Sequence, residues 1–243
     1  MSLESNPRAD AVCEGGDLDC GSGLLLIIRE AFEPLAPGGV LEIRSSEISV
    51  KEDLPAWCRM VGHALLAAVP SQGRSISYFV RKSAEDTSLA ADLEEARNFR
   101  WQVRAATGEG STTRVFARNH HIDIGQPASF DTADAAPSAV EVLLAALAGD
   151  LVAGLRWRAS RAKVELQQME LSLSTRASDP GVFLGLTKQG PGGLAEIEGR
   201  LYVQSPASSE ELEALWSDTL ARSLLAQTLL AGTEVKLELK SIP

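Results

Sequence analysis

KEDLPAWCRMVGHALL, residues 51–66, is the stretch that decides how the N-terminal half of the chain folds. Asp53 is a preferred type of helix N-cap and Pro55 suits a first helical turn, so the stretch predicts a helix from Asp53 to about Ala68. The apolar side chains of this helix fall on one face: Leu54, Trp57, Cys58, Val61, Leu65 and Ala68. We therefore interpret Cys58 as a core residue and His63, which falls opposite that face, as a surface or interdomain residue.

The segments on either side predict the rest of a small mixed domain. Residues 24–35 are an apolar-rich helical stretch that ends at the Pro-Gly-Gly of residues 37–39. Residues 40–44 (VLEIR) alternate like a half-buried strand, and residues 75–81 (SISYFVR) predict a last strand. Residues 1 to about 83 are therefore expected to form one unit.

Cys20 lies in the sequence DCGSG (residues 19–23), directly before the first predicted helix. The dipole and the free N–H groups at a helix start favour a thiolate, which would lower the pKa of this thiol. The negative charges of Glu14, Asp17 and Asp19 would raise it. Placement alone leaves two interpretations open, a reactive thiol and a buried structural cysteine. Cys13, in the lead-in to this segment, shows no obvious role.

Three segments together, DLDCGSGLLLIIREAF (17–32), PGGVLEI (37–43) and residues 51–66, resemble the TusA (SirA-like) sulfur-carrier family. The resemblance implies a two-layer α+β sandwich of βαβαββ type, with a cysteine that carries sulfur as a persulfide. Cys20 is the matching position. The family writes this motif as Cys-Pro-x-Pro, whereas Gly21 and Gly23 stand here, so we expect a less rigid helix start.

The second half is expected to begin after an acidic linker. Residues 84–98 contain five acids and no aromatic residue, which is typical of a linker with at most a solvated helical turn. From residue 99 to the end at 243 we expect a second domain. Its predicted elements are strands at 99–107, 113–121, 163–175, 196–204 and 236–240 and helices at 138–158 and 208–230.

The stretch PSAVEVLLAALAGDLVAGL (137–155), preceded by HID (121–123) and GQP (125–127), resembles the central helix region of the OsmC/Ohr family. The resemblance implies an α+β domain with a long central buried helix packed on an antiparallel sheet. It also implies a homodimer formed through this domain, whereas carriers of the first family are usually monomeric. Asp150 and Ser223 occupy the places of the two family cysteines, with Arg222 beside the second.

Residues 99–243 contain no cysteine, so the thiol peroxidase chemistry of that family is excluded for this domain alone. An unpaired carboxylate at the rim of an apolar face is costly, so Asp150 is predicted to approach Ser223 or Arg222. In its sharpest form this is a short hydrogen bond between Asp150 and Ser223. The pair is either a repurposed polar pocket or a vestigial site held together by hydrogen bonding.

Composition narrows the possible partners. The net charge of −10 and the pI near 4.9 argue against nucleic acid and against an anionic membrane surface. The most apolar stretch, residues 139–155, is too short and too charged to span a bilayer. An odd count of three cysteines and no visible secretory signal lead us to expect a cytoplasmic protein.

No cofactor or metal site is expected. His120 and His121 are adjacent on a predicted strand, so their side chains would point to opposite faces and could not share one ion. His121 and Asp123 could share a face, but two ligands are weak evidence for a metal. No glycine-rich phosphate loop or Ser-His-Asp arrangement is evident.

Three functions remain after these observations. The first is a sulfur relay in which Cys20 carries sulfur between a donor and an acceptor protein, with a catalytically inactive OsmC-like domain for dimerisation or binding. The second is a non-catalytic ligand-binding or scaffold protein that uses the pocket of Asp150 and Ser223. The third is a composite redox protein in which Cys20 reaches into the OsmC-like site.

Overall fold

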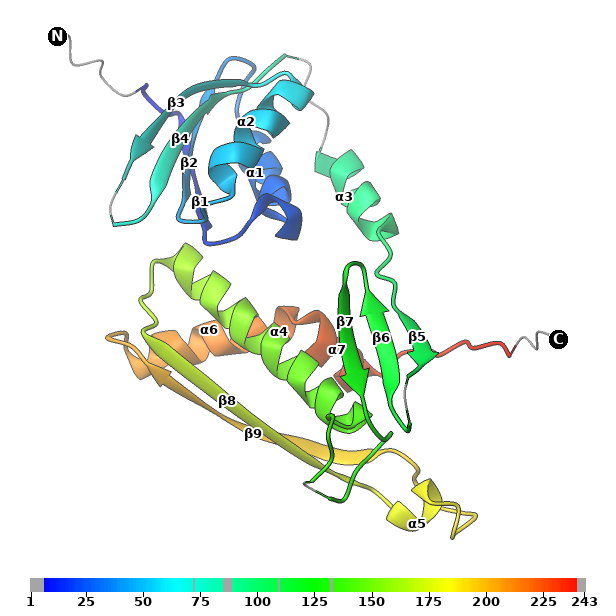
Figure 1. Ribbon diagram of the computed structural model, residues 1–243. Helices are drawn as coiled ribbons and strands as arrows, with labels where there is room; N and C mark the ends of the chain where they lie inside the picture. The colour runs from blue at the N-terminus through cyan, green and yellow to red at the C-terminus, as the bar shows by residue number, and fades with distance from the viewer. Residues whose placement is uncertain (1–6, 72, 85–88, 109, 132, 240–243) are drawn as a thin grey trace. The chain divides into compact units, whose positions relative to one another are not determined.

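The computed structural model describes residues 7–71, 73–84, 89–108, 110–131 and 133–239 (Figure 1). The chain divides into two compact units, one of residues 1–101 with 157–164 and one of residues 102–156 with 165–243. The domain limits of 83 and 99 stay a prediction. None of the helices in the described ranges is long and apolar enough to cross a bilayer.

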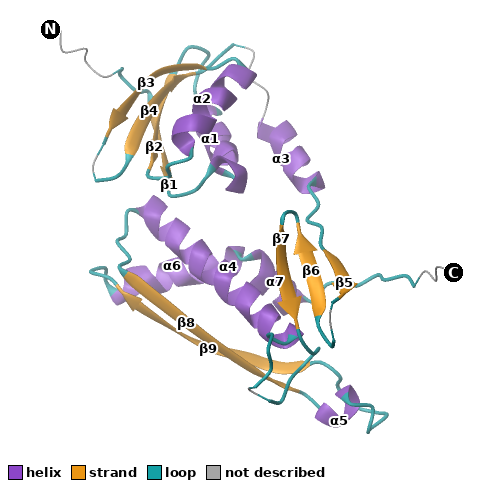
Figure 2. Cartoon of the chain, in the orientation of Figure 1, coloured by secondary structure: helices purple, strands orange, loops and turns teal. Residues whose placement is uncertain are grey.

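The first unit is the expected two-layer βαβαββ sandwich. Its strands and helices are β1 (Ala11–Gly16), α1 (Leu24–Phe32), β2 (Val40–Ser45), α2 (Val50–Val61), β3 (Ala64–Pro70) and β4 (Ile76–Arg81). The sheet has the order β1-β2-β4-β3, with β1 parallel to β2 and the other pairs antiparallel. Both helices lie on one face of it (Figure 2).

The second helix of this unit is shorter than predicted, and the lead-in segment is regular. The helix predicted to reach Ala68 ends at Val61, because Gly62 takes the left-handed conformation (φ 79°) at its C-cap. The following Ala64–Pro70 is strand β3, which pairs with β4. The lead-in segment is strand β1, and Cys13 within it is buried.

The core of this unit lies between the helices and the sheet. It is formed by side chains from β1, α1, β2, α2 and β4: Cys13, Leu24, Ile28, Phe32, Leu41, Ile43, Val50, Leu54, Trp57, Cys58, Tyr78 and Val80. Cys58 is a core residue, as predicted. His63 is not a surface residue: it is buried, its ring contacts those of Phe32 and Trp57, and its Nδ1 accepts the N–H of Ser83.

The acidic segment contains a regular helix, α3 (Leu89–Asn98), rather than a single turn. A three-stranded antiparallel sheet follows, with β5 (Arg104–Thr107), β6 (Thr113–Ala117) and β7 (His120–Ile124) in that order. The single strand predicted over residues 113–121 is thus a hairpin. Arg118 provides the turn, with a φ of 56° that is rare for a residue other than glycine.

The rest of the second unit is a long helix packed on an antiparallel pair of strands, as expected. Helix α4 (Ala139–Ala162) begins at Ser138, whose backbone and side chain bond Glu141 in a capping box. Strands β8 (Gln168–Ala177) and β9 (Leu194–Gln204) pair, with the short helix α5 (Pro180–Phe183) between them. Leu147 and Leu151 of α4 form the local core with Ala226 and with partly buried side chains of the sheet.

The predicted C-terminal helix is broken in two. Helix α6 (Ser209–Arg222) and helix α7 (Leu224–Ala231) meet at Ser223, which has an extended backbone (φ −71°, ψ 122°). Residues 232–239 form no strand, and residue 240 of the predicted strand lies outside the described residues. The break matters for the site, because it makes Ser223 the N-cap of a new helix.

Candidate functional sites

Cys20 opens a short 3₁₀ turn, Cys20–Ser22, and not helix α1 itself. Asp19 caps this turn by accepting the N–H of Ser22 at 2.7 Å. Gly23 then takes a left-handed backbone (φ 111°), and α1 begins at Leu24. Cys20 therefore lies in a separate turn before α1 and is not the N-cap residue of that helix.

The surroundings of Cys20 hold its thiol in the neutral form. The side chain is partly buried against the edge of the core, and burial raises the pKa of the thiol to about 11, helped by the negative charges of Asp53 and Asp19. Of the two opposing effects expected from the sequence, the one that raises the pKa prevails. Of the charges named from the sequence, Asp19 acts as expected, whereas the influence of Asp53 comes from α2 and could not be seen in the local sequence.

Gly23 explains what the lost proline of the family motif means structurally. A φ of 111° is available to glycine but not to proline, whose ring fixes φ near about −65°. The segment from Cys20 to Gly23 thus has a backbone of its own, and it is not simply a looser copy of Cys-Pro-x-Pro.

Asp150 and Ser223 meet in the second unit, as predicted. Ser223 Oγ donates a hydrogen bond to Asp150 Oδ2 at 2.5 Å, and the N–H of Leu225 donates to the same oxygen at 3.4 Å. Ser223 Oγ also accepts the N–H of Ala226 at 2.9 Å and so caps α7. Arg222 is not part of this contact, because its Nε bonds Asp218 at 2.6 Å. That Asp150, Ser223 and Arg222 form a functional pocket stays a prediction.

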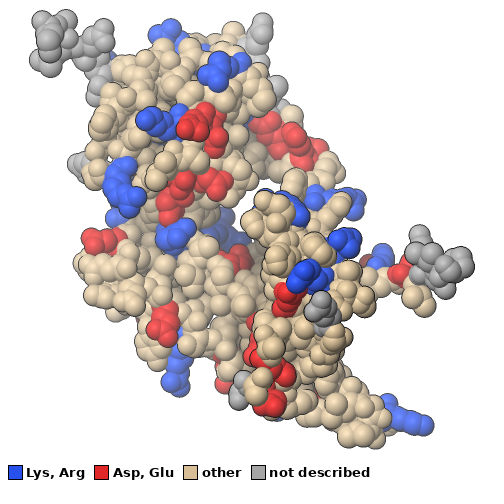
Figure 3. Space-filling view, viewed as in Figure 1, with Lys and Arg blue, Asp and Glu red and all other residues tan. Residues whose placement is uncertain are grey.

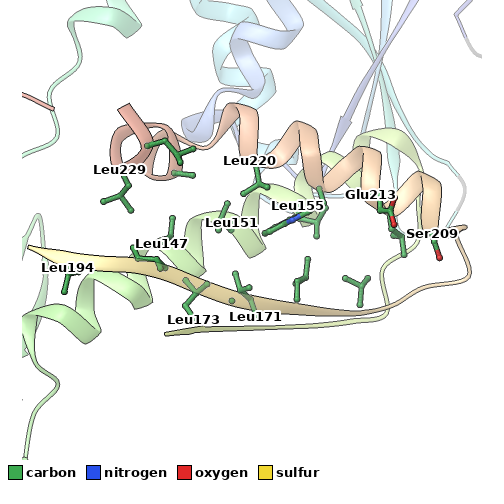
Figure 4. Close-up of a pocket in the computed structure, with 18 of the residues that line it drawn as sticks. Leu147, Leu151, Leu155, Leu171, Leu173, Leu194, Ser209, Glu213, Leu220 and Leu229 are labelled. Carbon is green, nitrogen blue, oxygen red and sulfur yellow. The ribbon is translucent and has the colours of Figure 1, made fainter. Parts of the chain in front are cut away.

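An open apolar cavity of about 870 Å³ lies in the same unit, between the sheet β8–β9 and helices α4, α6 and α7 (Figure 4). Leu147 and Leu151 enter it from α4, and Leu171 and Leu173 from β8. Its few polar side chains include Ser209 and Glu213 of α6. Sequence analysis missed this cavity, although the alternation of β8 signals one apolar face.

The histidines show no metal-binding arrangement. His120 and His121 lie at the start of β7, and Asp123 forms a two-bond ion pair with Arg114 at 2.7 and 2.8 Å. That pairing holds the pKa of Asp123 below its usual range. Within the described ranges, no group of three or more His, Cys, Asp or Glu residues could hold a metal ion.

The two halves of the chain are similar to different known proteins. The sulfur carrier protein TusA of Pseudomonas entomophila is 32% identical to this chain over 76 residues, which are 92% of that protein and 31% of this chain. TusA of Pseudomonas aeruginosa strain PAO1 is 29% identical over 76 residues, 94% of its length and 31% of this chain. A model of the OsmC-like protein family matches residues 131–238. The chain belongs to the TusA sulfur-carrier family by its N-terminal part and carries an OsmC-like domain behind it.

Two solved structures that resemble part of the chain are an OsmC-like protein and an organic hydroperoxide resistance protein. An OsmC-like protein from Mycoplasma pneumoniae is 18% identical with a TM-score of 0.48, over 56% of this chain and 90% of that one. The organic hydroperoxide resistance protein OhrB of Bacillus subtilis is 19% identical with a TM-score of 0.39, over 58% of this chain and 98% of that one.

Proposed function

We propose that this protein works in a sulfur relay, carrying sulfur as a persulfide on Cys20 and passing it to an acceptor protein. One observation carries the proposal: Cys20 is partly exposed whereas Cys13 and Cys58 are buried, and it lies in the part of the chain that matches the TusA carriers. Burial keeps the other two thiols from a protein-sized donor, whereas the pKa does not separate the three, since it is raised to about 11 for each of them.

The transfer needs no external oxidant or reductant. The Cys20 thiolate attacks the outer sulfur of a donor cysteine persulfide, the donor S–S bond breaks, and the donor thiolate leaves. A new S–S bond forms on Cys20, and the proton of its thiol passes to the donor site. Because the pKa of Cys20 is about 11, the isolated protein holds little thiolate at neutral pH, so the donor has to assist this proton transfer.

Mass spectrometry tests the proposal directly. The protein is incubated with a cysteine desulfurase and cysteine, and Cys20→Ser is treated in parallel. Wild type is expected to gain the mass of one sulfur atom on the peptide that contains Cys20, and the variant is expected to gain none. Cys58→Ala is the matched control and should load like wild type. An unmodified Cys20 under conditions that load an authentic TusA would reject the sulfur relay.

For the OsmC-like domain we propose a role in dimerisation, without peroxidase activity. It has no thiol, and Asp150 and Ser223 are bonded to one another where a thiol pair would be needed. It also buries few apolar side chains for its length, while Leu224 and Leu230 of α7 are 67% and 78% exposed. A second copy that packs on this side would remove them from water.

Analytical ultracentrifugation of the full chain tests the dimer. A dimer in the micromolar range is expected, and Leu230→Glu is expected to weaken it. A monomer at all concentrations would reject dimerisation. It would favour instead the second candidate, an apolar ligand in the cavity of about 870 Å³, which has the size and lining of a small-molecule site.

A further inference from the structure

A buried arginine joins helix α3 to the carrier-like sandwich. Arg29 of α1 is only 4% exposed, and its Nε lies 2.5 Å from Oδ2 of Asp92 on α3. On its other side, the guanidinium carbon of Arg29 lies 5.2 Å from the centroid of the Trp57 ring. Trp57 belongs to α2 and is itself buried. Asp92 and the ring of Trp57 are thus both in contact with the guanidinium of Arg29.

Helix α3 lies at the surface, where it packs on α1. None of its residues is buried, and Leu93 is 37% exposed. Ten residues are too few for a helix that is stable by itself in water. Acidic side chains gather over it, which is visible in Figure 3, and they include Asp92, Glu94 and Glu95. The contact between Asp92 and Arg29 is therefore one of the interactions that hold it in place.

We propose that α3 is a displaceable cover, and that the surface of Arg29 and Trp57 beneath it is a docking site for an acidic helical segment of a partner protein. Helix α3 is itself an example of such a ligand, already seated there. A guanidinium over an indole ring attracts a carboxylate by its charge, and the contact of Arg29 with Asp92 is an ion pair of this kind. When α3 moves away, an acidic residue of the partner takes the place of Asp92.

The tether explains why the surface is closed in the free protein. A helix attached to the same chain competes at a high effective concentration, so a free acidic segment binds weakly while α3 is intact. Removal of the charge of Asp92 weakens the tethered competitor and leaves Arg29 and Trp57 unchanged. The substitution Asp92→Asn therefore opens the site without altering the site itself.

The test uses the full-length protein and a synthetic peptide of residues 84–98. Hydrogen exchange of the α3 amides is expected to be at least about tenfold faster in Asp92→Asn than in wild type, because a charge-assisted contact is lost. The peptide is expected to bind Asp92→Asn at least about tenfold more tightly than wild type, with NMR shifts of the Trp57 indole. Glu95→Gln, the same charge change on the same helix, should behave like wild type.

Several results would overturn the proposal. These are unchanged exchange of α3 in Asp92→Asn, equal affinity of the peptide for both proteins, and equal binding of a peptide with Asn in place of Asp92. Self-association of Asp92→Asn through exchanged α3 helices, with no peptide binding, would also contradict it, since the occupant would then be a second copy. None of these measurements involves Cys20, so the outcome is separate from that of the sulfur relay.

Discussion

Alkylation of Cys20 should be slow at neutral pH and should rise steeply with pH. Its surroundings raise the pKa of the thiol from 9.0 to about 11. At pH 7 a shift of that size reduces the thiolate fraction about a hundredfold relative to an unperturbed thiol. The rate with iodoacetamide, followed by mass spectrometry of the Cys20 peptide, is expected to rise about tenfold per pH unit from 7 to 10 without a plateau.

The same assay separates the causes of the shift. Asp53→Asn removes one of the two negative charges that raise the pKa of Cys20, so its rate profile should move to lower pH and its rate at pH 8 should rise several-fold. Glu52→Gln, the neighbouring exposed acid, is the matched control and should leave the profile in place. A plateau below pH 9 in wild type, or equal profiles for the two variants, would refute the electrostatic account of this thiol.

Three further predictions concern stability. Ser223→Ala should lower the free energy of unfolding by about 2–3 kcal/mol, because it removes the cap of α7 and the part-buried bond to Asp150. Ser208→Ala, which removes the exposed capping interactions of α6 with Glu211, should cost about 1 kcal/mol in urea titrations. Gly23→Pro should destabilise strongly because φ is 111°, while Gly21→Ala, at a position without a positive φ, should change thermal unfolding little. Burial raises the pKa of the Cys58 thiol from 9.0 to about 11 in the folded protein. The neutral thiol therefore contributes fully to the free energy of unfolding below pH 9. Between pH 9 and 11 that contribution falls by about 1.4 kcal/mol per pH unit, because only the unfolded chain loses the proton there. Cys58→Ala should show a shallower alkaline loss of stability than wild type, and equal slopes would contradict this.

The fold was predictable where periodicity and capping agree. Helices α1 and α4 and strands β2, β4, β8 and β9 lie close to their predicted positions, and α2 does so up to Val61, because each has an apolar face of the right period. Strand β3 was missed because its sequence ALLAAVP continues the apolar content of the preceding helix. The segment is a strand because Gly62, in the left-handed conformation, ends the helix and because the residues after it pair with β4.

The candidate sites were predictable in position but not in chemistry. The contact of Asp150 with Ser223 was predictable although the two residues are far apart in the sequence, because they match the positions of two family cysteines. The pKa of Cys20 depends on burial and on Asp53, which α2 brings close from a distant part of the sequence. The ion pair of Arg29 with Asp92 could not be predicted either, because the two residues are distant in the sequence and the acidic segment by itself is typical of a solvated linker.

Under the proposed sulfur relay, the carboxylates near Cys20 would also define what a sulfur donor has to supply. Asp19 and Asp53 raise the pKa of the thiol by repelling negative charge, and that repulsion opposes the thiolate in the transfer step. A donor surface with Lys or Arg at these two positions would be attracted by the carboxylates and would cancel their effect on the thiol. Binding and activation would then have one electrostatic cause, and a neutral thiol in the free protein would be protected from reaction with any partner that lacks the matching charge.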